Sequence, residues 1–340
     1  MPNFSPSNLV KAQARLIDRF TEAELRSKQS PALALALKNR SILIPTHEQL
    51  RTREDRPVEA YVLARTKRAT TAARTHNHAG NRGGSFAMPL SWTSFVDKFS
   101  ISLKQLDNNV FAFEEALGQQ LLNSAINIHE SLETFLIDYL IAQRSQINAA
   151  TSGGTWNATN DAFEIALANK SRFYQLAKSM MRQNNYRGTF DVLASSLTYV
   201  DGEFYANQGG GNQTNTNFQF TGLNIQESVE LEDANYAGGI SLIMPAGQFA
   251  GLPWIPKQNR EGHGDYNSYL GGYGSILDPT GSGLTLAVHG YTQRADTSGS
   301  NGNTQDDVME FEISLDLAPA LAPLSVATES VVFEVAQLAA

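Results

Sequence analysis

The sequence predicts an α+β protein, and three features of the chain predict this class. A proline-free segment from Val110 to Ile147 carries apolar residues at helical spacing. From residue 189 onward, short runs of alternating apolar residues are separated by glycine-rich turns, as in β-strands. A polar arm between residues 60 and 107 precedes the long helical segment. Because an arm and helices come first and a β-rich portion follows them, the class is α+β.

The composition is that of a globular protein without thiol chemistry. With 340 residues, the chain is long enough for one large core or two modest ones. The absence of cysteine excludes disulfides, thiolate metal sites and cysteine nucleophiles. No apolar run approaches the length of a membrane span, and residues 1–7 lack the pattern of a signal peptide. We therefore expect a cytoplasmic origin and no membrane contact.

The charge is distributed unevenly along the chain. Residues 1–100 carry 16 Lys and Arg against 8 Asp and Glu, whereas residues 101–340 carry 10 against 26. Such asymmetry indicates a charged partner. Nucleic acid would be opposed by the acidic bulk, whereas another copy of the chain offers an acidic surface to the basic third. Self-association is therefore favoured over direct binding of nucleic acid. Complementary charges on two copies would determine how the copies align more than how tightly they bind.

The N-terminal region is predicted to begin with one amphipathic helix over residues 8–29. Leu9, Leu16 and Leu25 are among the apolar residues that fall near helical spacing. Residues 41–45 form a short apolar stretch that ends at a proline. The charged segment that follows, up to residue 60, is expected to be irregular or docked on the body.

The arm between residues 60 and 107 is predicted to form an extended hairpin loop. An outgoing run (60–64) and a returning run (99–103) alternate in polarity on either side of a glycine-rich tip. There is no acidic residue between Ala60 and Val96, and the basic residues there are Arg65, Lys67, Arg68, Arg74 and Arg82. The alternative is a disordered surface loop. The apolar side chains of the arm argue against this alternative, because they require a surface that buries them. They include Phe86, Trp92 and Phe95.

The segment from Val110 to Ile147 is predicted to be one very long helix. Leu117, Leu121, Ile128 and Leu132 belong to an apolar stripe with spacings of three and four. A helix of this length would span roughly 57 Å, or about 45 Å if Gly118 breaks its first turns. A compact globule of this size has a diameter near ~52 Å, so we expect a flattened or elongated subunit.

A second helix is predicted over residues 160–183, and the Asn184–Gly188 segment stops it. The remaining chain is predicted to form strands and turns, without an internal repeat. The expected strands cover residues 218–220, 223–225, 240–244, 284–288, 310–317 and 330–335.

The motifs of catalytic and metal sites are incomplete in this chain. The His289-Gly290 turn would need a Gly-x-Ser-x-Gly elbow to act in a hydrolase, and no such elbow is present. His76 and His78 lack further ligands at a suitable spacing. Residues 296–307 depart from a calcium loop at its sixth and twelfth places, so a surface loop is favoured. We predict no catalytic residue, cofactor or metal ion, and we do not expect an enzyme.

Glu310, Glu312 and Asp316 are predicted to point to one face of a strand. This face is interpreted as solvated, or as an acidic strip that receives a basic neighbour. A glycan-binding or glycan-hydrolysing protein is the alternative, because paired carboxylates can serve as acid and base. In that case the Trp- and Tyr-rich segment 254–273 would contribute to the site.

The order of these elements resembles the major capsid proteins of tailed bacteriophages, whose fold is shared with encapsulins and the herpesvirus capsid floor. The segment Glu130-Ser-Leu-Glu-Thr-Phe-Leu-Ile-Asp-Tyr-Leu-Ile141 is similar to their spine helix. The segment Lys178–Arg187 looks like the end of their axial-domain helix, and residues 285–292 and 307–316 are similar to their C-terminal parts. The resemblance covers nearly the whole chain.

The resemblance implies a capsid fold divided into five segments. They are an N-terminal arm (1–59), an extended loop (60–107), the spine helix and peripheral domain (108–159), an axial domain with peripheral-domain strands (160–316), and a C-terminal strand of the peripheral domain (317–340).

The function that the resemblance implies is structural. Copies of the chain would form hexamers and pentamers of an icosahedral shell around double-stranded DNA, with portal, scaffolding and decoration proteins as further partners and the virion as location. An encapsulin-like compartment is the alternative within the same fold. A lysine–asparagine crosslink is not carried over, since no local pattern identifies a pair.

We hypothesise that the basic arm lies on an acidic face of the neighbouring subunit. Its aromatic residues would hold the contact and its charges would steer it. The candidate contact residues are Arg65, Lys67, Arg68, Arg74, Arg82, Phe86, Trp92, Phe95, Glu310 and Glu312.

Overall fold

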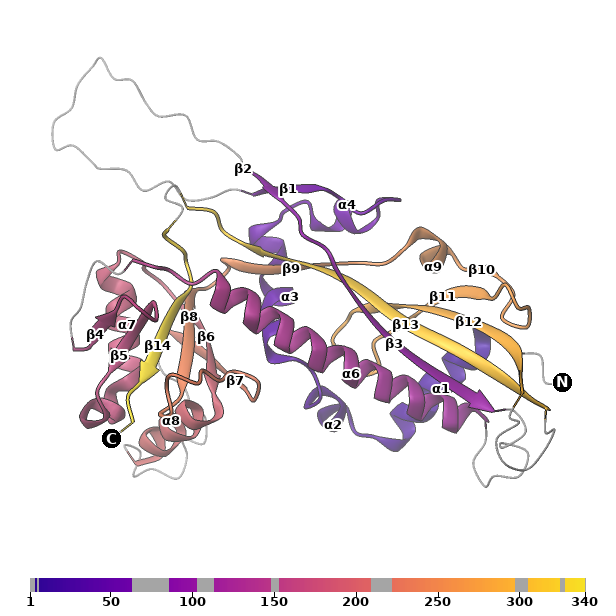
Figure 1. Ribbon diagram of the computed structural model, residues 1–340, viewed down its shortest axis with the longest axis horizontal. Helices are drawn as coiled ribbons and strands as arrows, with labels where there is room; N and C mark the ends of the chain where they lie inside the picture. Colours follow the sequence, from indigo (N-terminus) through magenta and orange to yellow (C-terminus); the bar gives the residue numbers. More distant parts are fainter. Residues whose placement is uncertain are drawn as a thin grey trace, which may run out of the picture.

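The protein is elongated, with one six-stranded sheet along the side of a long central helix and a second one beyond the C-terminal end of that helix (Figure 1). The computed structural model describes residues 4, 6–62, 86–102, 113–147, 153–208, 222–296, 305–324 and 328–339. Helices and sheets are both present and the helical N-terminal part precedes most strands, so the predicted α+β class is confirmed.

The long central helix is α6 (Phe113–Ala142), which confirms a spine at the predicted place. Its 30 residues correspond to about 45 Å. Leu117, Leu121 and Leu132 of the predicted stripe are fully buried. Gly118 does not break the helix. A Cβ atom there would lie 2.9 Å from the carbonyl oxygen of Ala12, so the glycine allows the first helix to cross closely.

The N-terminal region contains four helices in place of the single predicted one. They are α1 (Pro6–Arg19), α2 (Glu22–Arg26), α3 (Pro31–Leu43) and α4 (His47–Arg51). The prediction of one helix over 8–29 is wrong because Thr21 caps α2. Its hydroxyl accepts from Glu24 N, and the Glu24 carboxylate accepts from Thr21 N at 2.8 Å.

Helix α3 was not predicted, and residues 41–43 of the predicted apolar stretch 41–45 form its C-terminal end. Its sequence, PALALALKNRSIL, has apolar residues on nearly every side. Ala32, Leu33, Leu35 and Ala36 are all fully buried, because α3 lies between α6 and the larger sheet. A helix that is apolar all round leaves no amphipathic period to detect.

The larger sheet has six strands in antiparallel pairs and carries the longest strands of the molecule. Its order is β10 (His263–Gly264), β11 (Gly272–Leu277), β12 (Thr285–Asp296), β13 (Gln305–Leu321) and β3 (Thr93–Ser102), with β9 (Phe249–Trp254) also on β13. Phe311, Ile313 and Leu315 of β13 are buried, as their alternation predicts. The short helix α9 (Lys257–Glu261) packs on β11 and β12.

The smaller sheet lies at the C-terminal end of α6 (Figure 1). Its order is β4 (Thr155–Asn157), β5 (Ala162–Ile165), β14 (Phe333–Gln337), β8 (Ile240–Pro245), β6 (Phe190–Ser195) and β7 (Leu223–Ser228). The β14–β5 and β6–β7 pairs are parallel. The C-terminal strand therefore joins the sheet of residues 155–245 and not that of β13. The five-segment division stays a prediction.

The second predicted helix is only half correct. Helix α7 (Phe173–Gln183) occupies its second half, whereas the first half forms β5 and a 3₁₀ turn at Leu167–Arg172. Phe163 and Ile165 are both buried in the sheet, at the spacing of two that a strand requires. Helix α8 (Ser196–Gln208) replaces part of the predicted strand-and-turn region. The expected strand at 218–220 lies outside the described residues.

The base of the predicted hairpin loop is a separate two-stranded sheet of β1 (Glu59–Val62) and β2 (Phe86–Pro89). Val62 pairs with Phe86, so the two ends of the segment 63–85, which lies outside the described residues, are side by side. The predicted returning run at 99–103 is wrong as part of this hairpin. It belongs to β3, where Phe99 pairs with Phe311 of β13.

Candidate intersubunit contact surfaces

The base of the hairpin loop is fixed to the body by aromatic and arginine side chains. The indole nitrogen of Trp92 donates to the carbonyl oxygen of Pro57 at 2.7 Å. The rings of Trp92 and Trp254 lie edge to face, with centroids 6.4 Å apart. The Arg56 guanidinium lies over Trp254 and pairs with the buried Asp316 carboxylate at 2.9 Å. Side-chain packing therefore fixes the segments next to the β1–β2 ribbon on the larger sheet.

Three exposed apolar side chains lie on or beside the β1–β2 ribbon, where the register places Tyr61 and Phe86 on opposite faces. The exposed fractions are 79% for Val58, 55% for Tyr61 and 46% for Phe86. A two-stranded ribbon is only marginally stable in water unless another surface covers it. We call these three residues the ribbon patch. Of the predicted aromatic anchors, Phe86 alone is exposed enough to offer a neighbour a large apolar surface.

The other two predicted anchors contact the chain itself. Phe95 is 9% exposed, and its ring lies edge to face on Phe135 of α6 with centroids 5.4 Å apart. Trp92 is partly buried in the main core. The five predicted basic residues of the loop, together with His76 and His78, lie outside the described residues.

Glu310 and Glu312 lie on the solvent-facing side of β13, two residues apart on an open sheet face and not across a cleft. The Glu312 carboxylate pairs with the Lys98 ammonium at 3.2 Å, and Glu310 accepts from Gln293 at 3.0 Å. Lys98 is 71% exposed, so this pair is weak and easily exchanged for another cation. That this face receives a basic partner from another copy stays a prediction.

Two further exposed apolar surfaces were not predicted. On α8, Leu197, Val200 and Phe204 are 55–58% exposed and fall at spacings of three and four, which forms a stripe along the helix. We call it the α8 stripe. At the other end of the molecule, Tyr269 and Leu270 are 81% and 70% exposed in the turn between β10 and β11. The stripe could have been found from its spacing, had residues 196–208 been assigned to a helix.

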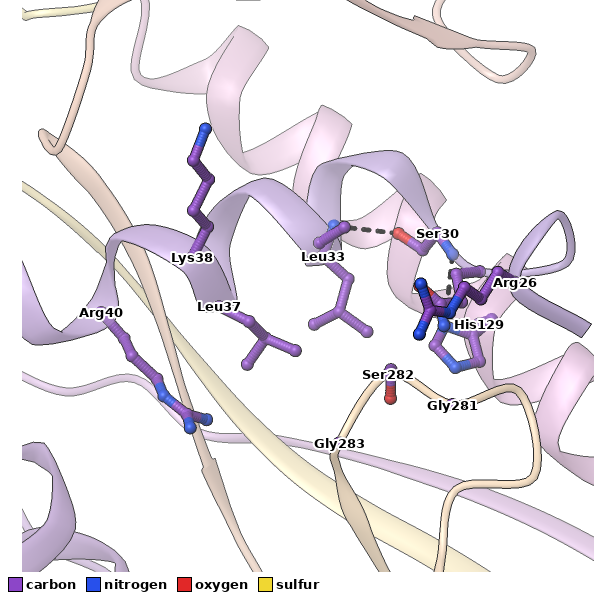
Figure 2. A pocket seen from close by; sticks show the side chains of 12 residues that line it. Arg26, Ser30, Leu33, Leu37, Lys38, Arg40, His129, Gly281, Ser282 and Gly283 are labelled. Atoms are coloured by element: carbon purple, nitrogen blue, oxygen red, sulfur yellow. Dashed lines mark hydrogen bonds between the residues drawn. The ribbon is translucent and has the colours of Figure 1, made fainter. Parts of the chain in front are cut away.

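A pocket of about 410 Å³ lies between α3 and the loop Gly281–Gly283 (Figure 2). Arg26, Lys38 and Arg40 are among its lining residues, and Ser30 and His129 lie at its inner end. Arg26 pairs with Glu22 at 3.4 Å and Arg40 with Glu48 at 3.9 Å, and the carboxylates of Glu133 and Asp278 are buried. The polar side chains of the floor are bonded to one another, so the pocket is better explained as structural.

The polar groups behind this pocket form a closed set of hydrogen bonds. Ser30 N donates to His129 Nδ1 at 3.2 Å, so Nε2 carries the ring proton and faces Asp278 at 2.7 Å. Burial opposes ionisation of Asp278, but hydrogen bonds from His129, Ser282 and Thr280 together outweigh it and lower the pKa of the Asp278 carboxyl. Glu133 accepts from Ser30 Oγ, from Ala32 N at 2.9 Å and from Ser228 Oγ at 2.5 Å.

Among the residues whose structure is described, no three His, Asp or Glu side chains are grouped so that they could hold a metal ion. Within the same ranges, no helix has both the length and the apolar character needed to cross a membrane.

Comparisons with known proteins relate the chain to capsid structures. No protein-family model matches the sequence, and no curated protein matches it. The chain is similar to the capsid of cyanophage A-1(L), with 11% identity, 91% of this chain and 93% of that chain covered, and a TM-score of 0.45. It is also similar to the mature capsid of bacteriophage PhiM1, with 12% identity, 84% and 83% covered, and a TM-score of 0.43.

A third similar structure is an encapsulin complex from Synechococcus elongatus, with 12% identity, 74% of this chain and 75% of that chain covered, and a TM-score of 0.39. The similar structures thus include phage capsids and an encapsulin, the two kinds of protein that the sequence resembles.

Proposed function

We propose that this chain is a structural subunit whose copies form the icosahedral capsid of a tailed phage around double-stranded DNA. The observation that carries the proposal is the ribbon patch, since Val58, Tyr61 and Phe86 have no covering surface among the described residues, whereas Ala60 and Val62 of the same ribbon are buried in the core. A neighbouring copy supplies that surface in an assembly. The proposal includes hexamers and pentamers as the units of the shell. It also includes the portal, scaffolding and decoration proteins as further partners of the chain.

The positions of the other exposed surfaces support assembly through contacts between different patches of neighbouring copies. The α8 stripe and the Tyr269–Leu270 turn lie near opposite ends of the elongated subunit (Figure 1). Contacts between different patches of identical subunits continue from copy to copy, and they close into rings or shells when the rotation permits. Each subunit then engages several neighbours at once, which stabilises a container built from weak contacts.

The basic loop residues Arg65 to Arg82 are proposed to lie across the Glu310–Glu312 face of the adjacent copy. Burial of one aromatic side chain contributes about 1.5–3 kcal/mol, whereas an exposed ion pair contributes about 0–1 kcal/mol. Tyr61 and Phe86 would therefore hold the contact, and the charges would select its register.

Replacing residues 64–84 by a short Gly-Ser turn is expected to abolish assembly without unfolding the chain. The change keeps β1, β2 and β3, so every described strand pair remains. Electron microscopy and size-exclusion chromatography of the purified protein should show folded small species and no shells. A matched variant of full length, with the five basic loop residues changed to glutamine, should still assemble but more slowly. Shells of unchanged size from the truncated chain would reject the proposal.

The α8 stripe is expected to be needed for closed particles. Changing Leu197, Val200 and Phe204 to serine removes about 1.5 kcal/mol or more for each side chain that a neighbour buries. The three residues are more than half exposed, so the subunit itself should keep its melting temperature within a few degrees. Val10→Ser, at an exposed apolar residue of α1, is the matched control and should assemble normally. Light scattering that reports full-sized particles from the triple variant would contradict this prediction.

The cargo separates a virus capsid from an encapsulin-like compartment. Purified particles should contain double-stranded DNA that survives nuclease treatment and is released when the shell is opened. Particles that instead hold a single protein cargo and no protected DNA would favour the compartment.

A further inference from the structure

Three aromatic rings lie next to one another on the solvent-facing side of the larger sheet. Tyr273 of β11 and His289 of β12 are directly opposite in the register, and their rings stack with centroids 4.5 Å apart. The centroid of the Tyr291 ring follows at 5.9 Å from that of His289. All three side chains are partly exposed, whereas Val288 and Gly290, which alternate with them along β12, are buried. We call these three aromatic residues the ring row.

The position of the ring row is fixed on one side by the turn between β10 and β11. Gly271 of this turn has a φ of +81°, and a Cβ atom there would lie 2.5 Å from His289 Nε2. The glycine therefore allows the turn to close over the imidazole. Within the described residues, His289 Nε2 is buried and makes no hydrogen bond, so stacking and this close contact hold the ring. The row is thus a preformed surface that binding does not need to order.

Two carboxylates border the ring row on its other side. The register places Glu312 of β13 opposite His289 and Glu310 opposite Tyr291. Residues that face each other in this way have Cβ atoms about 4.5–5.5 Å apart. Lys98, the cation paired with Glu312, comes from β3 on the far side of β13 and is 71% exposed. Lys98 therefore approaches from the side away from the rings, which leaves the ring side of Glu312 to another cation.

Rings beside carboxylates suit a guanidinium better than an ammonium. The planar guanidinium of arginine binds a carboxylate through two parallel N–H groups and stacks on aromatic faces, whereas the lysine ammonium is a compact, strongly hydrated charge. The segment 63–85, whose two ends meet at the β1–β2 ribbon, contains four arginines, one lysine and no acidic residue. Its basic residues are therefore mostly of the kind that this surface favours.

We propose that the ring row, together with Glu310 and Glu312, is a binding site for an arginine side chain from the hairpin loop of a neighbouring copy. The carboxylate of Glu312 holds the guanidinium, and Tyr291 and His289 provide the aromatic surface on which it lies. The identity of the partner rests on the proposed function, since assembly brings the loop of one copy to the sheet of another. The preference for arginine over lysine rests on the site alone.

Peptide binding to the full-length subunit, kept below the concentration at which it assembles, tests the site. A fluorescently labelled peptide of residues 63–85 is compared with a second peptide in which Arg65, Arg68, Arg74 and Arg82 are changed to lysine. Fluorescence anisotropy should show that the arginine peptide binds the wild-type subunit about two- to fivefold more tightly, the ratio expected for one exposed cation–π contact. Both peptides carry the same charge, so electrostatic attraction alone predicts equal affinities.

Substitutions in the subunit locate the effect on the ring row. Tyr291→Leu removes the ring and keeps apolar bulk, so the arginine peptide should weaken to the level of the lysine peptide, which itself should bind as before. Glu312→Gln should weaken both peptides, because it removes the carboxylate that either cation uses. Tyr269→Leu, at a more exposed tyrosine of the neighbouring turn, is the matched control and should bind both peptides like the wild type.

Equal affinity of the two peptides for the wild-type subunit would overturn the proposal, and this comparison requires no variant subunit. A loss of both peptides to the same degree in Tyr291→Leu would also overturn it. If the arginine peptide does not bind while shells still form, the site is wrong and the proposed function stands. Selective arginine binding by a chain that never forms shells would instead reject the proposed function and leave the arginine site in place.

Discussion

Glu133→Ala is expected to lower the free energy of unfolding by about 4 kcal/mol, among the largest effects of any single substitution in this chain. Glu133 is 4% exposed, and its carboxylate accepts from Ser30 Oγ, Ala32 N and Ser228 Oγ. The substitution leaves these buried donors without their acceptor, and each such loss costs about 1–3 kcal/mol, although the losses do not add fully.

The position of Glu133 makes this effect larger than that of an ordinary buried polar group. Ser30 caps α3, and its hydroxyl accepts from Leu33 N at 3.0 Å while donating to Glu133. Ser228 ends β7 of the smaller sheet. One carboxylate on the spine helix thus holds the start of α3 and an edge of the smaller sheet. Its removal should loosen both attachments together.

Urea denaturation followed by circular dichroism measures this prediction. Glu130→Ala is the matched control, since it makes the same change three residues earlier on the exposed side of α6 and should cost less than about 0.5 kcal/mol. Ser228→Ala should cost about 1–2 kcal/mol, because it removes one of the three donors. Equal midpoints for Glu133→Ala and Glu130→Ala would show that the buried hydrogen bonds contribute nothing.

The elements that could be predicted are those with one clear period. The spine helix has a single apolar stripe over 30 residues, and β13 alternates between buried and exposed residues, so both were placed correctly. Helix α3 was missed because its alanine and leucine residues are buried on all sides. The start of the second predicted helix was wrong because Phe163 and Ile165 fit a short strand as well as a helical turn.

The exposure of the candidate contact residues was only partly predictable. Phe86 and the Glu310–Glu312 face follow from the pattern of the sequence, but a single sequence does not tell whether an aromatic residue packs on its own chain or on a neighbour. Phe95 therefore appeared equivalent to Phe86 although it packs on Phe135. The α8 stripe shows the opposite case. Its apolar residues are exposed, but in the sequence their helical spacing cannot be distinguished from that of a buried helix face.

The buried polar groups could not be predicted from local patterns. Ser30 and His129 are 99 residues apart, and His129 and Asp278 are 149 residues apart. Residues so distant in sequence are brought together by packing of helix on sheet, which has no signature in a short window. The same holds for Arg144 and Glu334, which meet only because the C-terminal strand returns to the smaller sheet.

Arg144→Met is expected to destabilise the protein by about 3 kcal/mol at pH 8.5, because it leaves the ionised Glu334 buried without its cation. The lower end of the range for broken buried pairs applies, since the Arg144 side chain is 20% exposed. At pH 5.5 the loss should be clearly smaller. Below its pKa of about 7, Glu334 carries a proton and no longer needs the guanidinium as a counter-ion.

The double variant Arg144→Met with Glu334→Gln separates loss of charge pairing from loss of packing. A neutral amide in place of the carboxylate removes the uncompensated charge, so most of the stability lost at pH 8.5 should return. Arg182→Met, at an exposed arginine of α7, is the matched control and should change the urea midpoint little. If the single variant loses the same stability at both pH values and the double variant recovers none of it, Arg144 acts through its packing and not as the cation of Glu334.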